Sequence, residues 1–158
     1  MKAIRRVVPV CLALVAGLGI LVTGCGGSDD DSGDGALTRE ELSAAATDVC
    51  LPAGDAINEA VGKMFAGPKP GPQEFAEVST TTVIPQLTEQ TDGLAELQPP
   101  NDLEDAYASY LDSAEQVLVD LKADPAAPFT GDPAEFYADS NEKGRAAGLP
   151  DVCLAGPG

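Results

Sequence analysis

The sequence has 158 residues and a net charge of −17, and it contains no His and no Trp. A surface this acidic repels nucleic acid and anionic lipid headgroups, so we expect no nucleic-acid partner. The missing His removes the commonest general base and the commonest metal ligand of proteins.

Residues 1–24 carry the three parts of an export signal. Three basic residues form a positive start, an uncharged apolar run covers residues 7–22, and two small residues come directly before Cys25. The run of 16 residues is shorter than a membrane-spanning helix, which needs about 20 residues. The pattern therefore predicts a cleaved signal peptide at 1–24.

The tetrapeptide Val-Thr-Gly-Cys at 22–25 resembles the lipobox of bacterial lipoproteins. The resemblance implies cleavage after Gly24, a diacylglyceryl thioether on Cys25 and often an acyl chain, such as palmitate, on the new amino terminus. The cleaved chain has six basic and 26 acidic side chains, a net charge of −20. We therefore expect the lipid to hold the protein at the extracytoplasmic face of the cell membrane, since two or more acyl chains anchor stably.

Residues 25–36 are rich in Gly, Ser and Asp and have no apolar side chain before residue 36, apart from Cys25. This composition predicts a flexible acidic spacer that leads to a domain at 37–158.

The spacer also resembles the calcium-binding loop of an EF-hand over residues 30–41. Hard cations bind several oxygen ligands around a sharp turn. No helix fits before the loop, and an acidic spacer followed by a helix cap explains the same pattern. Calcium binding is therefore the alternative function, and its candidate ligands are Asp30, Ser32, Asp34, Glu41 and the backbone carbonyl of Ala36.

The first predicted helix starts at a capping box formed by Thr38 and Glu41. Pro52 predicts a kink or a break between Cys50 and Gly54, and the Gly- and Pro-rich residues 67–72 end the helix. One face repeats apolar residues at spacings of three and four, namely Leu42, Ala46, Val49, Ala53, Ile57, Val61 and Met64.

The second predicted helix covers residues 73–98 and bends at Pro85. The β-branched run Thr80–Ile84 also fits a strand, but the flanking patterns favour a helix. Ser79–Thr82 is a weak candidate for O-linked sugar.

The third predicted helix covers residues 101–122, with Asn101 as its cap and with Tyr107 and Tyr110 on its buried face. A loop at 124–131 follows. The fourth helix starts at Asp132-Pro133 and ends at Gly148, and an extended tail reaches Cys153.

These segments predict an all-α fold, a small four-helix bundle with kinked helices. Cys11 lies in the signal peptide and Cys25 would carry the lipid. Cys50 and Cys153 remain as a pair that should form a disulfide in an oxidising compartment, tying the first helix to the end of the fourth.

The lipobox, the spacer, the Cys in the first helix and the closing Gly148-Leu149…Cys153 resemble a large group of uncharacterised small lipoproteins of actinobacteria. One extra residue in the closing spacing and Pro52 are departures from that group. The resemblance implies an envelope lipoprotein, and it supplies no catalytic residues.

The favoured function is therefore a non-enzymatic binding or interaction module of the cell envelope, whose partner is an envelope protein or a small ligand. A carboxylate-based hydrolase is a weaker alternative, because paired acids can transfer protons but are usually solvated on exposed helix faces. Its candidate groups are Asp102/Glu104/Asp105, Asp112/Glu115 and Asp139/Glu142.

Overall fold

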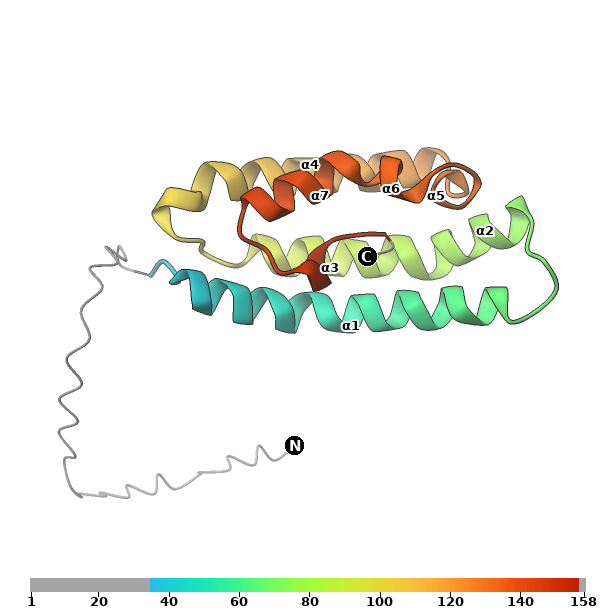
Figure 1. Cartoon of the computed structure of the whole chain (residues 1–158), viewed down its shortest axis with the longest axis horizontal. Coiled ribbons are helices and arrows are strands. Elements are labelled where there is room, and N and C mark those ends of the chain that lie inside the picture. Colours follow the sequence, from blue (N-terminus) through green and yellow to red (C-terminus); the bar gives the residue numbers. More distant parts are fainter. Residues whose placement is uncertain (1–34, 157–158) are drawn as a thin grey trace, which may run out of the picture.

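The computed structural model describes residues 35–156, where all regular structure is helical and no strand occurs (Figure 1). The all-α prediction is therefore confirmed. The predicted signal peptide and Cys25 lie outside the described residues. The elements are α1 (Arg39–Phe65), α2 (Pro72–Val78), the π-helical turn η1 (Ser79–Val83), α3 (Ile84–Ala95), the 3₁₀ turn η2 (Asn101–Leu103), α4 (Glu104–Ala123), α5 (Ala127–Thr130), α6 (Pro133–Phe136), α7 (Ala138–Ala146) and the 3₁₀ turn η3 (Asp151–Cys153).

The helices pack in the order of the chain. α1 lies along the continuous rod of α2, η1 and α3, α3 packs on α4, and α4 packs on α7 (Figure 1). The chain then returns to α1 through η3. None of the helices within residues 35–156 has the length and apolar composition that a membrane span requires.

The capping box at the start of α1 is confirmed. The Thr38 hydroxyl accepts a hydrogen bond from the Glu41 backbone N–H at 3.3 Å, and the Glu41 carboxylate accepts from the Thr38 N–H at 2.9 Å. Two N–H groups that the first helical turn leaves unpaired are satisfied in this way.

Of the kink or break predicted at Pro52, the break is wrong, because α1 continues through Pro52 to Phe65 as one helix. Proline removes the hydrogen bond to the carbonyl of Asp48, at a typical cost of about 3 kcal/mol in a helix interior. Asp48 and Pro52 are both exposed, so water can take over that hydrogen bond. The exposed position explains why the helix tolerates this proline.

The second segment is helical, as predicted, and the strand alternative at Thr80–Ile84 is wrong. The change of geometry before Pro85 takes the form of a π turn, in which the Ile84 N–H donates to the Ser79 carbonyl five residues earlier. Pro85 has no N–H to continue the α-helical pattern, and the wider turn accommodates that loss.

Ser79 is fully buried, so in the folded protein it cannot accept the predicted O-linked sugar. The next two hydroxyl groups, of Thr80 and Thr81, donate to backbone carbonyls of the preceding turn. Serine and threonine in helices commonly bond back to the helix in this way.

The third segment starts differently from the prediction. Asn101 opens the 3₁₀ turn η2, and its side chain does not cap α4. Tyr107 and Tyr110 are buried on α4 as predicted. The Tyr107 hydroxyl donates to the Leu94 carbonyl at 2.8 Å and so ties α4 to the end of α3. The predicted loop at 124–131 contains the short helix α5.

The fourth segment starts at Asp132, whose carboxylate caps α6 as predicted by accepting from the Ala134 N–H at 2.9 Å. A break at Tyr137 separates α6 from α7. Gly148 ends the segment with a φ of +75°, which is the predicted left-handed position. The predicted extended tail contains the 3₁₀ turn η3.

The predicted disulfide is confirmed. Cys50, in the middle of α1, is bonded to Cys153 in η3, with their Cα atoms 5.0 Å apart. Both cysteines belong to the larger of two apolar clusters, with Leu42, Ala46, Leu94, Leu103, Tyr107, Tyr110, Ala114, Ala147 and Leu149. The smaller cluster is formed by Val83, Leu87, Leu118 and Leu121.

We expect Gly93→Ala to destabilise the fold although alanine favours helices. A Cβ at Gly93 on α3 would lie 2.9 Å from a methyl group of Val49 on α1. Overpacking of this kind costs about 1–3 kcal/mol, which exceeds the roughly 1 kcal/mol that alanine gains over glycine in a helix. Thermal unfolding followed by circular dichroism measures the difference.

Gly62→Ala is the matched control, because a Cβ at Gly62 on α1 meets no atom within 4 Å. This variant should gain up to about 1 kcal/mol. A shift of both melting temperatures in the same direction would contradict the close helix approach at Gly93.

Candidate functional site

A groove of about 560 Å³ runs beside the second half of α1. Cavities of about 300–1,000 Å³ are typical of small-molecule sites. Its walls come from α1, the end of η1 with α3, the segment of α5 and α6, and residues 151–156. The lining is mainly apolar and includes Leu51, Ile57, Val61, Phe65, Val83, Leu87, Pro128, Phe129, Tyr137, Val152 and Leu154.

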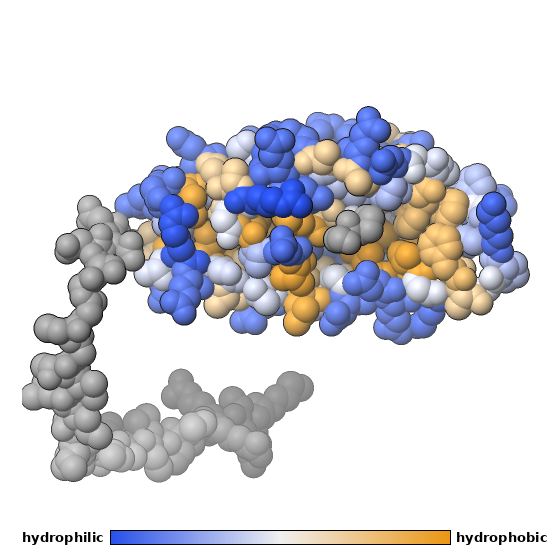
Figure 2. Space-filling view, in the orientation of Figure 1, coloured by the Kyte–Doolittle hydropathy of each residue, from blue (hydrophilic) through white to orange (hydrophobic). Residues whose placement is uncertain are grey.

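The groove exists because the second half of α1 is only partly covered by its neighbours. The predicted apolar face is buried at Leu42, Ala46 and Ala53, but no residue from position 54 onward in α1 is buried. At the two ends of the groove, Leu51 is 48% exposed and Phe65 is 56% exposed. Figure 2 shows apolar side chains gathered between α1 and the α5–α6 segment.

Glycines allow close helix packing in one half of the molecule, and prolines limit helix length in the other half. In the covered half, Gly93 lets α3 approach α1, and Gly144 lets α7 approach the ring of Tyr110 on α4. Opposite the second half of α1, prolines occur at positions 125, 128 and 133. They limit this part of the chain to short helices, so no long helix covers the apolar face.

Two carboxylates, of Asp55 and Asp151, are the charged groups among the described residues that line the groove, and no Lys or Arg lines it. Burial raises the pKa of Tyr137 to about 12, so its phenol stays neutral. The buried Gln90 amide donates to the Cys153 carbonyl at 3.1 Å and joins α3 to the C-terminal wall. The groove is thus an apolar site with an acidic rim.

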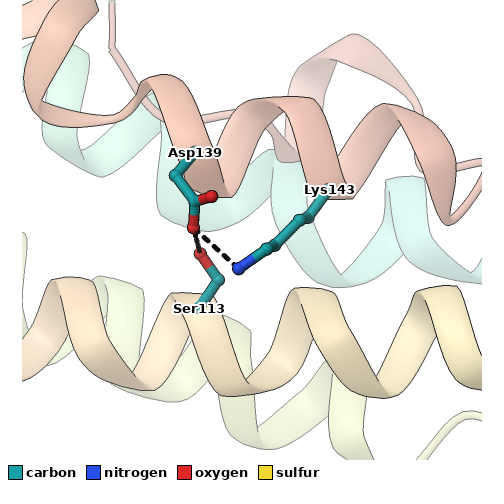
Figure 3. A network of polar contacts seen from close by, with 3 residues as sticks. All are labelled: Ser113, Asp139 and Lys143. Atoms are coloured by element: carbon teal, nitrogen blue, oxygen red, sulfur yellow. Dashed lines mark hydrogen bonds and ion pairs between the residues drawn. The ribbon is translucent and has the colours of Figure 1, made fainter.

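The predicted carboxylate clusters lie elsewhere, and all seven of their side chains are exposed. The best connected is Asp139 on α7, which accepts hydrogen bonds from Lys143 at 2.8 Å and from Ser113 on α4 at 2.9 Å (Figure 3). Both hydrogen bonds lower the pKa of Asp139, and the bond from Lys143 has the larger effect. Its partners fix α7 on α4 and keep the carboxylate ionised.

We expect Asp139→Asn to change how stability depends on pH. Because the folded-state pKa of Asp139 is lowered, its contribution is present above the unfolded value of about 3.9 and is lost as pH falls through the folded pKa. The variant should therefore be less stable than the wild type at pH 7. The difference should shrink below about pH 4, as urea unfolding at several pH values would show.

Asp112→Asn is the matched control, because Asp112 is an exposed acid on α4 with no hydrogen-bond partner within residues 35–156. At pH 7 its free energy of unfolding should lie within about 0.5 kcal/mol of the wild-type value, as is usual for a surface substitution. A constant difference between the wild type and Asp139→Asn down to pH 2 would contradict the role given to Asp139.

The candidate calcium loop lies mostly outside the described residues, which exclude Asp30, Ser32 and Asp34. Glu41 is exposed and belongs to the capping box. Its pKa is lowered mainly by the hydrogen bond from the Thr38 backbone N–H and further by the bond with the Thr38 hydroxyl. Calcium binding therefore stays a prediction. Within residues 35–156 no group of three or more acidic or Cys side chains could hold a metal ion.

Sequence reasoning did not find the groove. The periodicity of α1 predicts one continuous buried face. The sequence of α1 itself does not show that the segment opposite its second half forms only the short helices α5 and α6. The available signal was the high density of proline at 125–133, opposite an apolar face that continues past Ala53.

No known protein family, curated protein or solved structure matches this chain. The function therefore has to be inferred from the groove and from the sequence.

Proposed function

We propose that the protein is a lipid-anchored lipoprotein of the extracytoplasmic face of the cell membrane, and that its helices form a four-helix bundle acting as a non-enzymatic binding module. The lipobox at Cys25 supports the anchor. The Cys50–Cys153 disulfide supports export, because such bonds persist in oxidising compartments. The acidic surface leaves membrane attachment to the lipid.

The groove is the observation that carries the binding function. A soluble domain seldom leaves large apolar side chains exposed together unless the surface binds something. Here Leu51 and Phe65 are both about half exposed and border a concave site of about 560 Å³. Its volume favours a small apolar ligand over a protein surface.

The chemistry of the side chains supports binding over catalysis. Burial raises the pKa of Tyr107 and of Tyr137 to about 12, so neither phenol is a general base near neutral pH. The groove brings together no nucleophile with a base, and the carboxylate clusters of the described chain are solvated.

The anchor is tested by labelling cells with a palmitate analogue. The mature protein should carry the label, and Cys25→Ser should abolish it. The lipoprotein signal peptidase inhibitor globomycin should cause the uncleaved precursor to accumulate. Label that persists in Cys25→Ser would exclude Cys25 as the attachment site.

The groove is tested with the mature protein in lipid nanodiscs and 4-phenylbutanol as a soluble apolar probe. Saturation-transfer NMR, with empty nanodiscs as the baseline, should detect binding. Gly54 lines the groove, and a Cβ there meets no atom within 4 Å. Gly54→Leu should therefore project an isobutyl group into the groove and weaken binding.

Gly62→Leu is the matched control for this experiment. Gly62 is another open glycine of α1, but it does not line the groove. The control should bind the probe as the wild type does. Absence of binding to the wild type, or equal binding by the two variants, would overturn the proposed function.

A further inference from the structure

We infer that the ligand of the groove is a cationic amphiphile, an apolar molecule that ends in an amine or a quaternary ammonium group. The inference rests on the proposed binding function and adds the chemical class of the ligand. Three observations carry it: the aromatic rings, the charges at the rim and the dimensions of the groove.

Three aromatic rings line the groove, and two of them, of Phe65 and Phe129, gather with Phe75 near the close of α1. Phe65, Phe129 and Tyr137 line the groove, in a chain that has only seven Phe and Tyr residues. The Phe129 ring stacks on the Phe75 ring, with ring centres 5.2 Å apart. The centre of the Phe75 ring lies 6.2 Å from that of Phe65. Grouped aromatic faces attract cations, and quaternary ammonium ions most typically.

The rim adds negative charge from two separate elements. Asp55 lies on α1 and Asp151 lies in η3, and both carboxylates are exposed. Neither has an ion-pair partner within residues 35–156, so both are available to a ligand. No described lining residue is basic. An anionic amphiphile would therefore meet two like charges, whereas a cationic one meets two opposite charges.

The dimensions fit a small amphiphile. From Leu51 to Phe65 the axis of α1 rises by about 21 Å, at 1.5 Å per residue. The volume of about 560 Å³ lies within the range of about 300–1,000 Å³ that is typical of small-molecule sites. A slender apolar body fits the same space.

The test compares three soluble probes that share one apolar body: 4-phenylbutyltrimethylammonium, 4-phenylbutanol and 5-phenylpentanoate. Isothermal titration of the mature protein in nanodiscs, corrected for empty nanodiscs, gives the three affinities. We expect the cation to bind most tightly and the carboxylate most weakly. In Asp55→Asn/Asp151→Asn the affinity for the cation should fall by roughly 3- to 10-fold, as two partly exposed charge pairs would give.

Asp48→Asn/Asp92→Asn is the control, because it removes the same charge from exposed acids of α1 and α3 that do not line the groove. Its affinity for the cation should stay at the wild-type value. In the groove-rim variant the alcohol should lose less affinity than the cation does, because the alcohol carries no charge to pair with the two carboxylates.

Each contrary result has a distinct meaning. If the alcohol or the carboxylate binds best, or if both double variants weaken the cation equally, the groove still binds but the ligand class is wrong. If none of the three probes binds while a Leu- and Lys-rich helical peptide does, or while the protein forms dimers in the nanodisc through this face, the small-ligand function is wrong as well.

Discussion

Replacing both Cys50 and Cys153 by Ala is expected to lower the free energy of unfolding more than any other change considered for this protein. The bridge closes a loop with a sequence separation of 103 residues. Chain-entropy estimates give about 4.7 kcal/mol for a loop of this size. We expect the melting temperature to fall by roughly 10–20 °C, as circular dichroism of the mature protein would show.

Reduction of the wild-type protein provides the control, since it breaks the same bond without changing the side-chain volume in the core. Reduced wild type and the double variant should melt at similar temperatures. A double variant that melts within a few degrees of the oxidised wild type would show that the rest of the core holds α1 and η3 together unaided.

Leu94→Ala should have the second largest effect. Leu94 is 0% exposed in the larger apolar cluster, and truncation of such a leucine costs about 2–5 kcal/mol. We expect the upper part of this range because α3 cannot easily shift to close the cavity. The Tyr107 hydroxyl donates to the Leu94 carbonyl, and Val49 leaves no room even for a Cβ at the neighbouring Gly93.

Val119→Ala is the control for this truncation, because Val119 on α4 is 57% exposed. It should change stability by no more than about 0.5 kcal/mol. Urea unfolding of the two variants gives both values. A loss below about 1 kcal/mol for Leu94→Ala would mean that the helices around Leu94 can repack.

Local signals in the sequence predicted much of the fold. The Thr38–Glu41 capping box, the Asp132 cap and the Gly148 terminator each depend on residues within one turn, and the structure has all three. The Cys50–Cys153 pair followed from counting the cysteines that would remain after the predicted export and lipidation. The buried positions of Tyr107 and Tyr110 followed from the periodicity of α4.

The two prolines inside helices needed tertiary information. Pro52 does not break α1, because its surroundings are exposed and the helix is held at Cys50. Pro85 is accommodated by a π turn, which the local sequence does not distinguish from a bend. Neither outcome follows from the local cost of proline alone.

The groove could not be predicted for a related reason. An apolar face on α1 predicts that other elements pack against it. How closely they pack depends on how α5, α6 and residues 151–156, which come much later in the chain, fold back beside α1. Phe65 and Phe129 are 64 positions apart. Only the three-dimensional structure shows that they line one site.

The disulfide has a further consequence that depends on where its second cysteine lies. Cys153 sits within the stretch from Asp151 to Gly156 that forms one wall of the groove, so the bond to α1 tethers that wall. In a reducing cytoplasm the bond does not form, and the wall has only noncovalent contacts to hold it. On the proposed route to the extracytoplasmic face, oxidation would act as a maturation step that completes this wall of the groove only outside the cytoplasm.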